Sequence, residues 1–326
     1  MNQEYRCGLI SILIAACCCF GALPLRAAET YPNRPLRMVV PYAPGGNTDV
    51  LARLLARGLT THLGQQVVVD NRPGGNTLIG MELVARAPAD GYTIMLATLT
   101  FTVLPSLYRK LPFDVVKDYA PVTLAVTLPN VLVVHPAVPG RSLKEFIAHA
   151  KANRGKLSYA STGSGTSPHL SMELLKSMAQ IDLLHVPYKG GAPAMTDLIG
   201  GQVAAQFIGL PVAVPQIAAG KLRALAVTSK KRAGAAPNIP TVGETLPGYE
   251  MDPWFGVLGP SGIPKAAAAR LQGEISRILR APEMKDHLNS LGAEPAATTA
   301  DQFAAHIQSE IARYAKLVAL AGLKVE

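Results

Sequence analysis

The chain has 326 residues, of which 49% are hydrophobic, and this length predicts about two domains with substantial cores. Its 31 lysines and arginines outnumber 22 acidic residues, which gives a formal net charge of +9. The basic residues are scattered, with Lys230–Arg232 as the one tight run. The charge therefore favours solubility and weak attraction of small anions, and we expect no nucleic-acid partner.

Residues 1–27 have the pattern of a secretory signal peptide. Arg6 precedes the apolar stretch Gly8–Leu23, which is short for a membrane-spanning helix and leads to a small-residue cleavage site after Ala27. We therefore expect a periplasmic protein. The alternative is a lipoprotein signal, which would leave a lipid anchor on Cys17. All four cysteines of the chain lie in this leader, so we expect no disulfide and no thiolate chemistry in the mature protein.

The pentapeptide Pro-Gly-Gly-Asn-Thr occurs at Pro44–Thr48 and again at Pro73–Thr77. Each copy follows an apolar, β-branched run and precedes an amphipathic segment, so each predicts a strand, a glycine loop and a helix. Glycines let the backbone approach a ligand closely, and the amides of a helix N-terminus favour negative charge. The repeat therefore predicts a site for a small anion. Thr48 can donate a hydrogen bond to a ligand, whereas Asp49 is better explained as a stabiliser of the helix N-terminus.

The first part of the chain alternates strands with helices. The helix after Pro44–Thr48 places Leu51, Leu55 and Leu59 on one side and ends at Gly64. This alternation predicts a mostly parallel sheet covered by helices on both faces. The other expected elements here are the strands Leu36–Val40, Val67–Val69 and Thr93–Ala97 and the helix Ile79–Ala87.

The apolar strand Val131–Val134 opens a second run of the same alternation, and the chain is expected to cross back along Leu222–Thr228. We therefore predict one domain from residues 28–128 and 226–326 and a second from residues 129–225. The segment Lys230–Tyr249 is expected to be an ordered surface connection. The remaining expected elements are the strands Leu157–Ala160, Leu183–Pro187, Val203–Ile208 and Pro253–Pro260 and the helices Leu143–Ala152, Pro193–Ile199, Lys265–Arg280, Pro282–Leu291 and Asp301–Leu320.

The loop Ser161–Ser167 combines five hydroxyl side chains with two glycines. It directly precedes a helix predicted to begin at Pro168 with Ser167 as its N-cap. The loop offers donors, close approach and a favourable helix dipole, although a polar turn without a ligand would look the same. It is not a Walker loop, since no lysine follows its last glycine, and it contains no Gly-x-Ser-x-Gly nucleophile elbow.

Two further features have open interpretations. His169 and Glu173 lie one helical turn apart and could bind a metal, but two ligands without a third favour an ordinary polar pair. Trp254 is equally compatible with the core and with a cleft wall.

The order of several motifs resembles that of the solute-binding receptors of the tripartite tricarboxylate transporter family, often called the Bug family. The resemblance covers nearly the whole chain after residue 27. It is carried by Tyr31–Pro35, Val40–Asp49, Asn71–Gly74, Asp90–Thr93, Tyr159–His169, Pro187–Gly190 and Gly256–Pro260.

The resemblance implies an α/β protein of the type II periplasmic-binding-protein architecture, with two domains closing over a ligand cleft. It implies an organic carboxylate as ligand and a large and a small membrane subunit as partners. It also implies that the protein is a monomer without cofactor or metal and not an enzyme. The ligand-binding residues that it implies are Tyr42, Gly45, Gly46, Asn47, Thr48 and Thr100 in the first domain and Thr162, Gly163, Ser164, Gly165, Thr166, Ser167, Tyr188 and Gly209 in the second.

Two departures from the family pattern bear on the ligand. Gly75–Leu78 replaces a further glycine-rich run, and Ile208–Leu210 lacks an aspartate that is common after this strand. The missing carboxylate argues against a ligand with an amino group, because that cation would lose its counter-charge. We therefore expect a dicarboxylate, a tricarboxylate or an aromatic carboxylate. The first glycine loop is expected to touch the ligand together with Ser161–Ser167, and the second to shape the cleft wall.

Two alternative functions remain open at the level of sequence. The first is a secreted serine hydrolase that uses Ser164 or Ser167 with His169, although serine before proline at a helix start is better explained by capping. The second is an orphan receptor that passes its signal to a partner. For a transport receptor, we expect the ligand to close the domains about crossings near Leu128 and Leu225.

Overall fold

The computed structural model describes residues 31–249, 251–290, 292–320, 322 and 323. The chain divides into two compact units, residues 1–33 and 34–326, and every helix and strand named below belongs to the second. The expected signal peptide, its cleavage site after Ala27 and the alternative anchor at Cys17 lie outside the described residues. Within the described ranges, no helix combines the length and the apolar character needed to cross a membrane.

The first sheet has six strands. They are β1 (Leu36–Val40), β2 (Val67–Asn71), β3 (Thr93–Thr98), β4 (Tyr119–Thr127), β10 (Trp254–Pro260) and β11 (Glu294–Pro295). Their order across the sheet is β11-β4-β10-β3-β1-β2. β1 pairs in parallel with β2 and β3, whereas β10 runs antiparallel to β3 and β4, and β11 antiparallel to β4.

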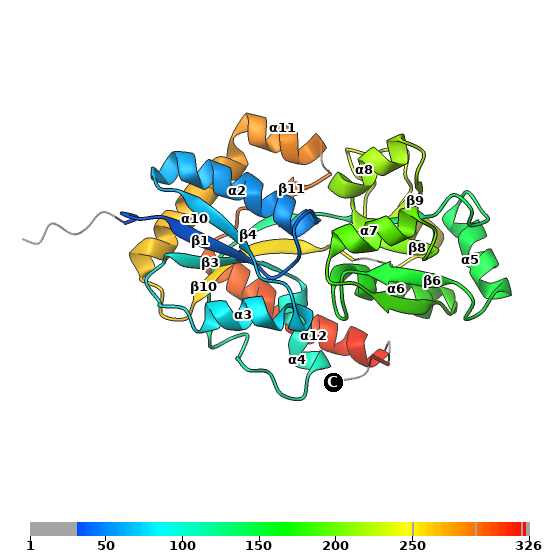
Figure 1. The fold of residues 1–326 in the computed structure, drawn as a ribbon, viewed down its shortest axis with the longest axis horizontal. Coiled ribbons are helices and arrows are strands. Elements are labelled where there is room, and N and C mark those ends of the chain that lie inside the picture. The colour runs from blue at the N-terminus through cyan, green and yellow to red at the C-terminus, as the bar shows by residue number, and fades with distance from the viewer. Residues whose placement is uncertain (1–30, 250, 291, 321, 324–326) are drawn as a thin grey trace, which may run out of the picture. The chain divides into compact units, whose positions relative to one another are not determined.

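The helices around the first sheet pack one apolar face against it. They are α2 (Asn47–Leu63), α3 (Leu78–Ala85), α4 (Thr100–Leu107), α10 (Lys265–Arg280), α11 (Pro282–Ser290) and α12 (Ala300–Leu320). α2 buries Leu51, Leu55 and Leu59, as its periodicity predicts, and ends at Gly64 with a left-handed φ of 67°. α10 packs on α2 and β4, and α12 packs on α4 and β4 (Figure 1).

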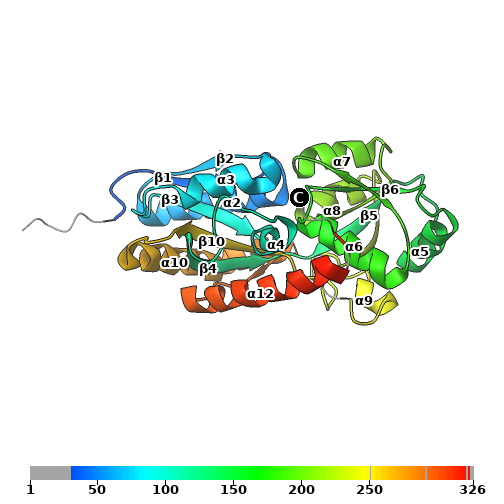
Figure 2. The same ribbon diagram turned by 90° about the horizontal axis from the view of Figure 1, so that it is seen from below.

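The second sheet has five strands in the order β7-β6-β8-β5-β9. The strands are β5 (Asn130–Val134), β6 (Ser158–Ser161), β7 (Leu184–Pro187), β8 (Ala205–Gly209) and β9 (Arg223–Val227). The helices that accompany them are α5 (Leu143–Ala152), α6 (Ser167–Ala179), α7 (Gly191–Ile199), α8 (Leu210–Ala218) and α9 (Val242–Thr245). Seen from below, α6 and α7 lie on opposite sides of this sheet (Figure 2).

The α/β class and the two helix-flanked sheets agree with the prediction, and most strands of each sheet share one direction, with β10 and β11 reversed in the first sheet and β5 in the second. In the first sheet β1, β2 and β3 share one direction and β10 is reversed. In the second sheet β6, β7 and β8 share one direction and β5 is reversed. β5 and β10 are the strands by which the chain enters each sheet from the other. They begin at the edge where the neighbouring strands end and therefore run the opposite way.

The chain passes from the first sheet to the second through a two-residue segment and returns through the longer segment 228–253, and the two paths bond to each other. Only Leu128 and Pro129 separate β4 from β5, and the Leu128 amide donates to the Pro253 carbonyl at 2.9 Å. On the return path the Met251 amide donates to the Thr228 carbonyl at 3.3 Å. The domain boundaries at 128/129 and 225/226 stay a prediction; β9 continues to Val227 before the chain leaves the second sheet.

Candidate functional site

Loops that follow strands of both sheets enclose a small cavity. Because β1 and β3 run parallel, and β6 and β8 run parallel, the loops after these strands lie at the carboxyl edges of their sheets, where α/β proteins bind ligands. The cavity between them has a volume of about 60 Å³. Its lining comes from both sheets, and no lysine, arginine, histidine, aspartate or glutamate among the described residues contributes to it.

Three helices begin at this cavity. Asn47 is the first residue of α2, Ser167 the first of α6 and Gly191 the first of α7, and all three line the cavity. The free amides and the positive dipole end of a helix N-terminus attract anions. The arrangement therefore supplies positive electrostatic potential without a positively charged side chain.

The first glycine loop is held in place by Asp49. This carboxylate accepts hydrogen bonds from the Gly45 amide, Arg53 Nε and Asn71 Nδ2, each at 3.0 Å. Burial, the largest influence, raises the pKa of Asp49, but the hydrogen bonds from Arg53, Gly45 and Asn71 together outweigh it, so the pKa is lowered. All three donors belong to the protein itself, which supports the stabilising role expected for Asp49.

Tyr42 forms the floor of the first loop. Its hydroxyl lies 2.8 Å from Thr98 Oγ1 and donates to Thr100 Oγ1 at 3.0 Å. Burial raises the pKa of Tyr42, and the bonds to the two threonines oppose the shift. Thr100 is fully buried behind Tyr42 and is not part of the cavity lining, whereas Thr98 is.

Some hydroxyl groups of the hydroxyl-rich loop are already engaged in hydrogen bonds within the protein. Thr166 Oγ1 donates to the Gly163 carbonyl at 2.7 Å, and Ser167 Oγ accepts from Asn130 Nδ2 at 2.5 Å. In the described part of the chain, the hydroxyls of Thr162 and Ser164 have no hydrogen-bond partner. The expectation that Ser167 caps α6 is wrong: the N-cap is Thr166, and neither side chain caps the helix, because both hydroxyls are engaged in the bonds above.

The predicted site residues fall into three groups. The cavity is lined by Tyr42, Gly46, Asn47, Thr48, Thr162, Thr166 and Ser167. An adjoining pocket of about 260 Å³ is lined by Gly163, Ser164 and Tyr188 together with Asn76 and Lys189. Neither pocket is lined by Gly45, Thr100, Gly165 or Gly209.

Several loop glycines allow the two sides of the cleft to lie close together. A Cβ atom on Gly46 would lie 3.6 Å from Gly191 N, and one on Gly190 would lie 3.0 Å from Ala43 Cβ. Gly209 makes room for a side chain, since its Cβ atom would lie 2.2 Å from Asn47 Nδ2. The sequence predicted close approach of a ligand, whereas these glycines allow close approach of one loop to another.

Several lining residues were missed from the sequence. Asn130 opens β5, Ile208 belongs to β8, and Phe255 belongs to β10. Trp254 satisfies both interpretations offered for it, because it is 1% exposed, packs edge-on against Phe303 and still lines the cavity. Among the described lining residues, Trp254 Nε1 and Asn47 Oδ1 are buried polar atoms without a partner. Such atoms indicate a polar ligand or water.

Two stacked histidines lie behind the hydroxyl-rich loop. The rings of His169 and His185 are 4.0 Å apart; His169 Nδ1 accepts from the Gly165 amide at 2.9 Å, and His185 Nε2 lies 2.6 Å from Ser161 Oγ. Burial lowers the pKa of His169 to about 3 and that of His185 to about 4, with Lys176 adding to both shifts and His185 adding to that of His169. Both rings therefore act as neutral supports of the loop.

This geometry does not favour the hydrolase or the metal interpretation. His169 bonds to a backbone amide and not to Ser164 or Ser167, and Ser161 beside His185 is fully buried. His169 Nε2 lies 4.0 Å from Glu173 Oε1, and the described residues contain no group of three or more His, Cys, Asp or Glu that could hold a metal ion.

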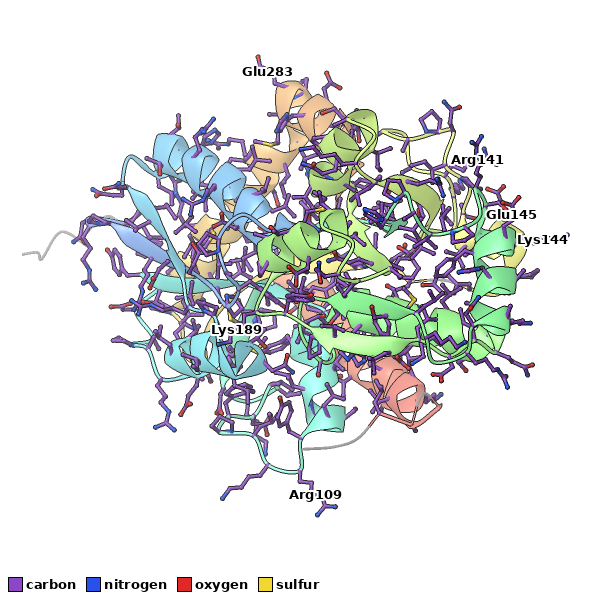
Figure 3. The ribbon with its side chains drawn as sticks, turned by 45° about the vertical axis from the view of Figure 1, so that its right-hand side comes forward. Arg109, Arg141, Lys144, Glu145, Lys189 and Glu283 are labelled. Carbon is purple, nitrogen blue, oxygen red and sulfur yellow. The ribbon has the colours of Figure 1, made fainter. Side chains whose placement is uncertain are left out.

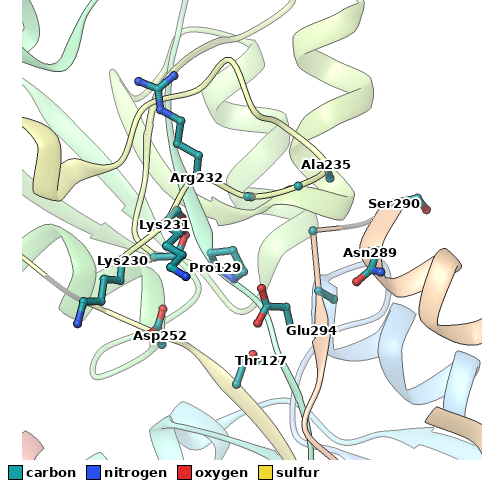
Figure 4. Close-up of a pocket in the computed structure, with 15 residues that line it drawn as sticks. Thr127, Pro129, Lys230, Lys231, Arg232, Ala235, Asp252, Asn289, Ser290 and Glu294 are labelled. Atoms are coloured by element: carbon teal, nitrogen blue, oxygen red, sulfur yellow. Dashed lines mark hydrogen bonds between the residues drawn. The ribbon is translucent and has the colours of Figure 1, made fainter. Parts of the chain in front are cut away.

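A larger pocket, of about 640 Å³, lies beside the chain crossings and is lined by residues 229–235 and parts of 289–294 (Figure 4). It contains Lys230 and Lys231, whereas Arg232 is paired with Glu244. None of the predicted ligand loops contributes to it. Other charged side chains, such as Arg109, Arg141 and Lys144, point outward from the fold (Figure 3). The small cavity is therefore the candidate site, and the fold and the site together define a two-domain solute-binding protein of the periplasmic-binding-protein class.

Comparison with known proteins gives the family. Residues 51–323 match the model of the tripartite tricarboxylate transporter family receptor. The chain is 37% identical to protein BugT of Bordetella pertussis over 329 aligned residues that cover 100% of both chains. The chain belongs to this receptor family.

Solved structures agree with this assignment. A structure of an R. palustris protein with adipate has a TM-score of 0.87 and 37% identity, covering 90% of this chain and 98% of that chain. The periplasmic binding protein BugD has a TM-score of 0.86 and 36% identity, covering 90% of this chain and 99% of that chain. These similarities confirm the predicted family and the type of fold.

Proposed function

We propose that the protein captures a small organic carboxylate in the periplasm and delivers it to a tripartite tricarboxylate-type membrane transporter. The convergence of three helix N-termini on an uncharged, hydroxyl-lined cavity is the observation that carries this proposal. A hydrogen bond to a charged group contributes about 1.5–3 kcal/mol, and a partly buried helix end adds up to about 2 kcal/mol. A few such donors suffice to hold a carboxylate without an arginine.

The composition of the cavity supports a ligand with acidic groups and no amino group. Ile208–Leu210 lacks an aspartate that would offer a counter-charge, and the Asn47 amide lies against Gly209. An ammonium group placed among three helix N-termini would be repelled and would find no carboxylate. A related structure contains the dicarboxylate adipate, and we propose a dicarboxylate, a tricarboxylate or an aromatic carboxylate for this chain.

The proposed role includes partners and excludes catalysis. We propose that the mature protein acts as a monomer that docks on a large and a small membrane subunit, binds no cofactor and catalyses no reaction. The absence of a nucleophile with an accessible base among the described site residues supports this role, as does the membership of a receptor family.

Calorimetry against a panel of acids tests the ligand class. The panel contains aliphatic dicarboxylates of four to six carbons, citrate and benzoate, each matched with the corresponding amide. We expect at least one acid to bind with micromolar or better affinity and its amide to bind at least tenfold more weakly, because the amide lacks the charge that the helix ends stabilise. Tight binding of only a cationic or a neutral compound would overturn the proposal.

Two further measurements test the alternatives. Native mass spectrometry of the protein as purified is expected to show a co-purified acid. Hydrolysis of generic esters that disappears in Ser164→Ala would instead support the hydrolase. Co-purification with membrane subunits is expected for a transport receptor, whereas stable association with a signalling protein alone would support the orphan sensor.

A further inference from the structure

The two copies of the repeated pentapeptide have different backbones. In the first copy Gly46 is an extended N-cap that leads directly into α2. In the second copy Asn76 has φ 52° and Thr77 has φ 78°, and the chain makes a short turn before α3. Asparagine tolerates a positive φ better than most non-glycine residues, whereas a positive φ is strained for a β-branched threonine. The second copy is therefore held in a conformation that its sequence does not favour.

The strained turn directs the Asn76 side chain across the cleft. Asn76 Nδ2 donates to the Ser164 carbonyl at 2.7 Å and to Tyr108 Oη at 3.2 Å. Asn76 follows β2 of the first sheet, whereas Ser164 follows β6 of the second. Gly163 leaves the space that this contact needs, because a Cβ atom there would lie 2.8 Å from Asn76 Oδ1.

The other close contacts between these loops are of a different kind. Gly46 meets Gly191 and Ala43 meets Gly190 through van der Waals packing alone. In the described part of the chain, the bond from Asn76 to Ser164 is the hydrogen bond that joins a loop after a strand of the first sheet to a loop after a strand of the second. It can form only when the two sides of the cleft are together.

We propose that Asn76 is a positioning residue that latches the two domains at the mouth of the cleft and holds the hydroxyl-rich loop in its ligand-binding place. The local strain persists because it places the amide donor opposite Ser164. The latch favours the closed form of the unliganded protein and slows the release of a bound ligand. The second effect rests on the proposed function, whereas the first does not.

The latch is tested on the unliganded protein. Residues after 27 include no cysteine, so Arg57→Cys on α2 and Lys151→Cys on α5, both exposed positions, can carry a pair of spin labels. Asn76→Gly removes the amide and suits the positive φ. We expect the ratio of open to closed forms to rise about fivefold to tenfold, as for the loss of one net hydrogen bond.

Two controls separate the latch from strain and from unfolding. Thr77→Gly relieves the same kind of strain but keeps the Asn76 amide, so its label distances should match those of the parent protein. The urea midpoint of Asn76→Gly should fall by no more than the loss of about one net hydrogen bond explains, since glycine adopts this backbone freely. Unchanged distances in Asn76→Gly, or equal opening in Thr77→Gly, would overturn the proposal.

A second experiment measures how fast the acid found by calorimetry is released. In stopped-flow measurements, Asn76→Gly should release that acid several-fold faster than Thr77→Gly does. Equal release rates would overturn the effect of the latch on the ligand. If no acid binds to the parent protein, the proposed function fails, and the distance measurement still decides whether the latch exists.

Discussion

Gly209 packs against Asn47, which lines the cavity. Asn47 occupies the space that a side chain at residue 209 would need, and its buried Oδ1 has no partner among the described residues. The cavity lining at this point is therefore the Asn47 amide and not a carboxylate. Glycine at this position is therefore required by the packing of Asn47 and not by backbone flexibility.

Gly209→Ala tests this pairing. The backbone at Gly209 is extended, with φ −66° and ψ 146°, so alanine fits the backbone and only the contact with Asn47 is violated. We expect about a tenfold or greater loss of affinity for the acid, measured by calorimetry. Combining it with Asn47→Ala removes the collision, so the double variant should bind no more weakly than Asn47→Ala alone; a further loss in the double variant would contradict the steric explanation.

The buried His169 makes stability depend on pH. Its pKa is lowered to about 3, chiefly by burial, whereas an unfolded histidine has a pKa of about 6.5. Between these values the unfolded chain binds more protons than the folded protein, so stability is complete above about pH 6.5 and falls as the pH falls. Between pH 7 and 5 we expect His169 alone to cost about 2 kcal/mol of the free energy of unfolding.

Urea unfolding at pH 7 and pH 5 checks this dependence. His169→Gln keeps a side-chain acceptor for the Gly165 amide and cannot titrate, so its loss of stability between the two pH values should be smaller than that of the parent protein. Unfolded aspartates and glutamates remain mostly ionised in this window. Equal losses in the two proteins would contradict the expectation.

The site was predictable from sequence where a motif marks a loop. The glycine loop at Pro44–Thr48 and the hydroxyl-rich loop at Ser161–Ser167 both reach the cavity. Thr98 and Asn130 could not be found in this way, because each lies at the end of an apolar strand and approaches the cavity only through the pairing of that strand with its neighbours. Thr100 was predicted to contact the ligand, but it is the first residue of α4 and accepts a hydrogen bond from Tyr42. Thr98, two residues earlier, lines the cavity instead.

At the level of elements, the predicted strands and amphipathic helices are present, but α4, α8 and β4 were not anticipated. α4 is buried over most of its length and contains Pro105, so it shows no amphipathic period. α8 contains Pro215 in its interior, and β4 contains Pro121, and proline at such positions argues against both element types. The reversal of β5 and β10 depends on how the chain passes between the sheets, which periodicity does not encode.

α3 packs unusually close to the first sheet, and Gly80 is the reason. A Cβ atom at Gly80 would lie 2.8 Å from Pro41 Cβ and 2.9 Å from the Arg72 carbonyl oxygen. Alanine normally stabilises a helix relative to glycine by about 1 kcal/mol. For Gly80→Ala we expect the opposite, a loss of about 1–3 kcal/mol, because backbone atoms cannot move aside easily.

Urea denaturation of a matched variant checks this expectation. Gly273 lies in α10 with open space where a Cβ atom would be, so Gly273→Ala should raise the free energy of unfolding by about 0.5–1 kcal/mol. If both variants were stabilised, the close approach of α3 would not limit this position.

At the scale of the whole molecule, we expect the segments between the two sheets to act as a hinge. Only Leu128 and Pro129 join β4 to β5, and the Leu128 amide bonds to the Pro253 carbonyl at the end of the return path. We expect a saturating acid to decrease the radius of gyration measured by X-ray scattering, as in hinge-type receptors. Superimposable profiles with and without ligand would exclude a large closure.

The position of Trp254 has a practical consequence. It is the single tryptophan of the chain, and it lines the cavity while packed in the core. All indole fluorescence therefore originates at the candidate site, without background from elsewhere. The emission of the unlabelled protein can serve as a direct readout for screening compounds, and Trp254→Phe provides the dark control.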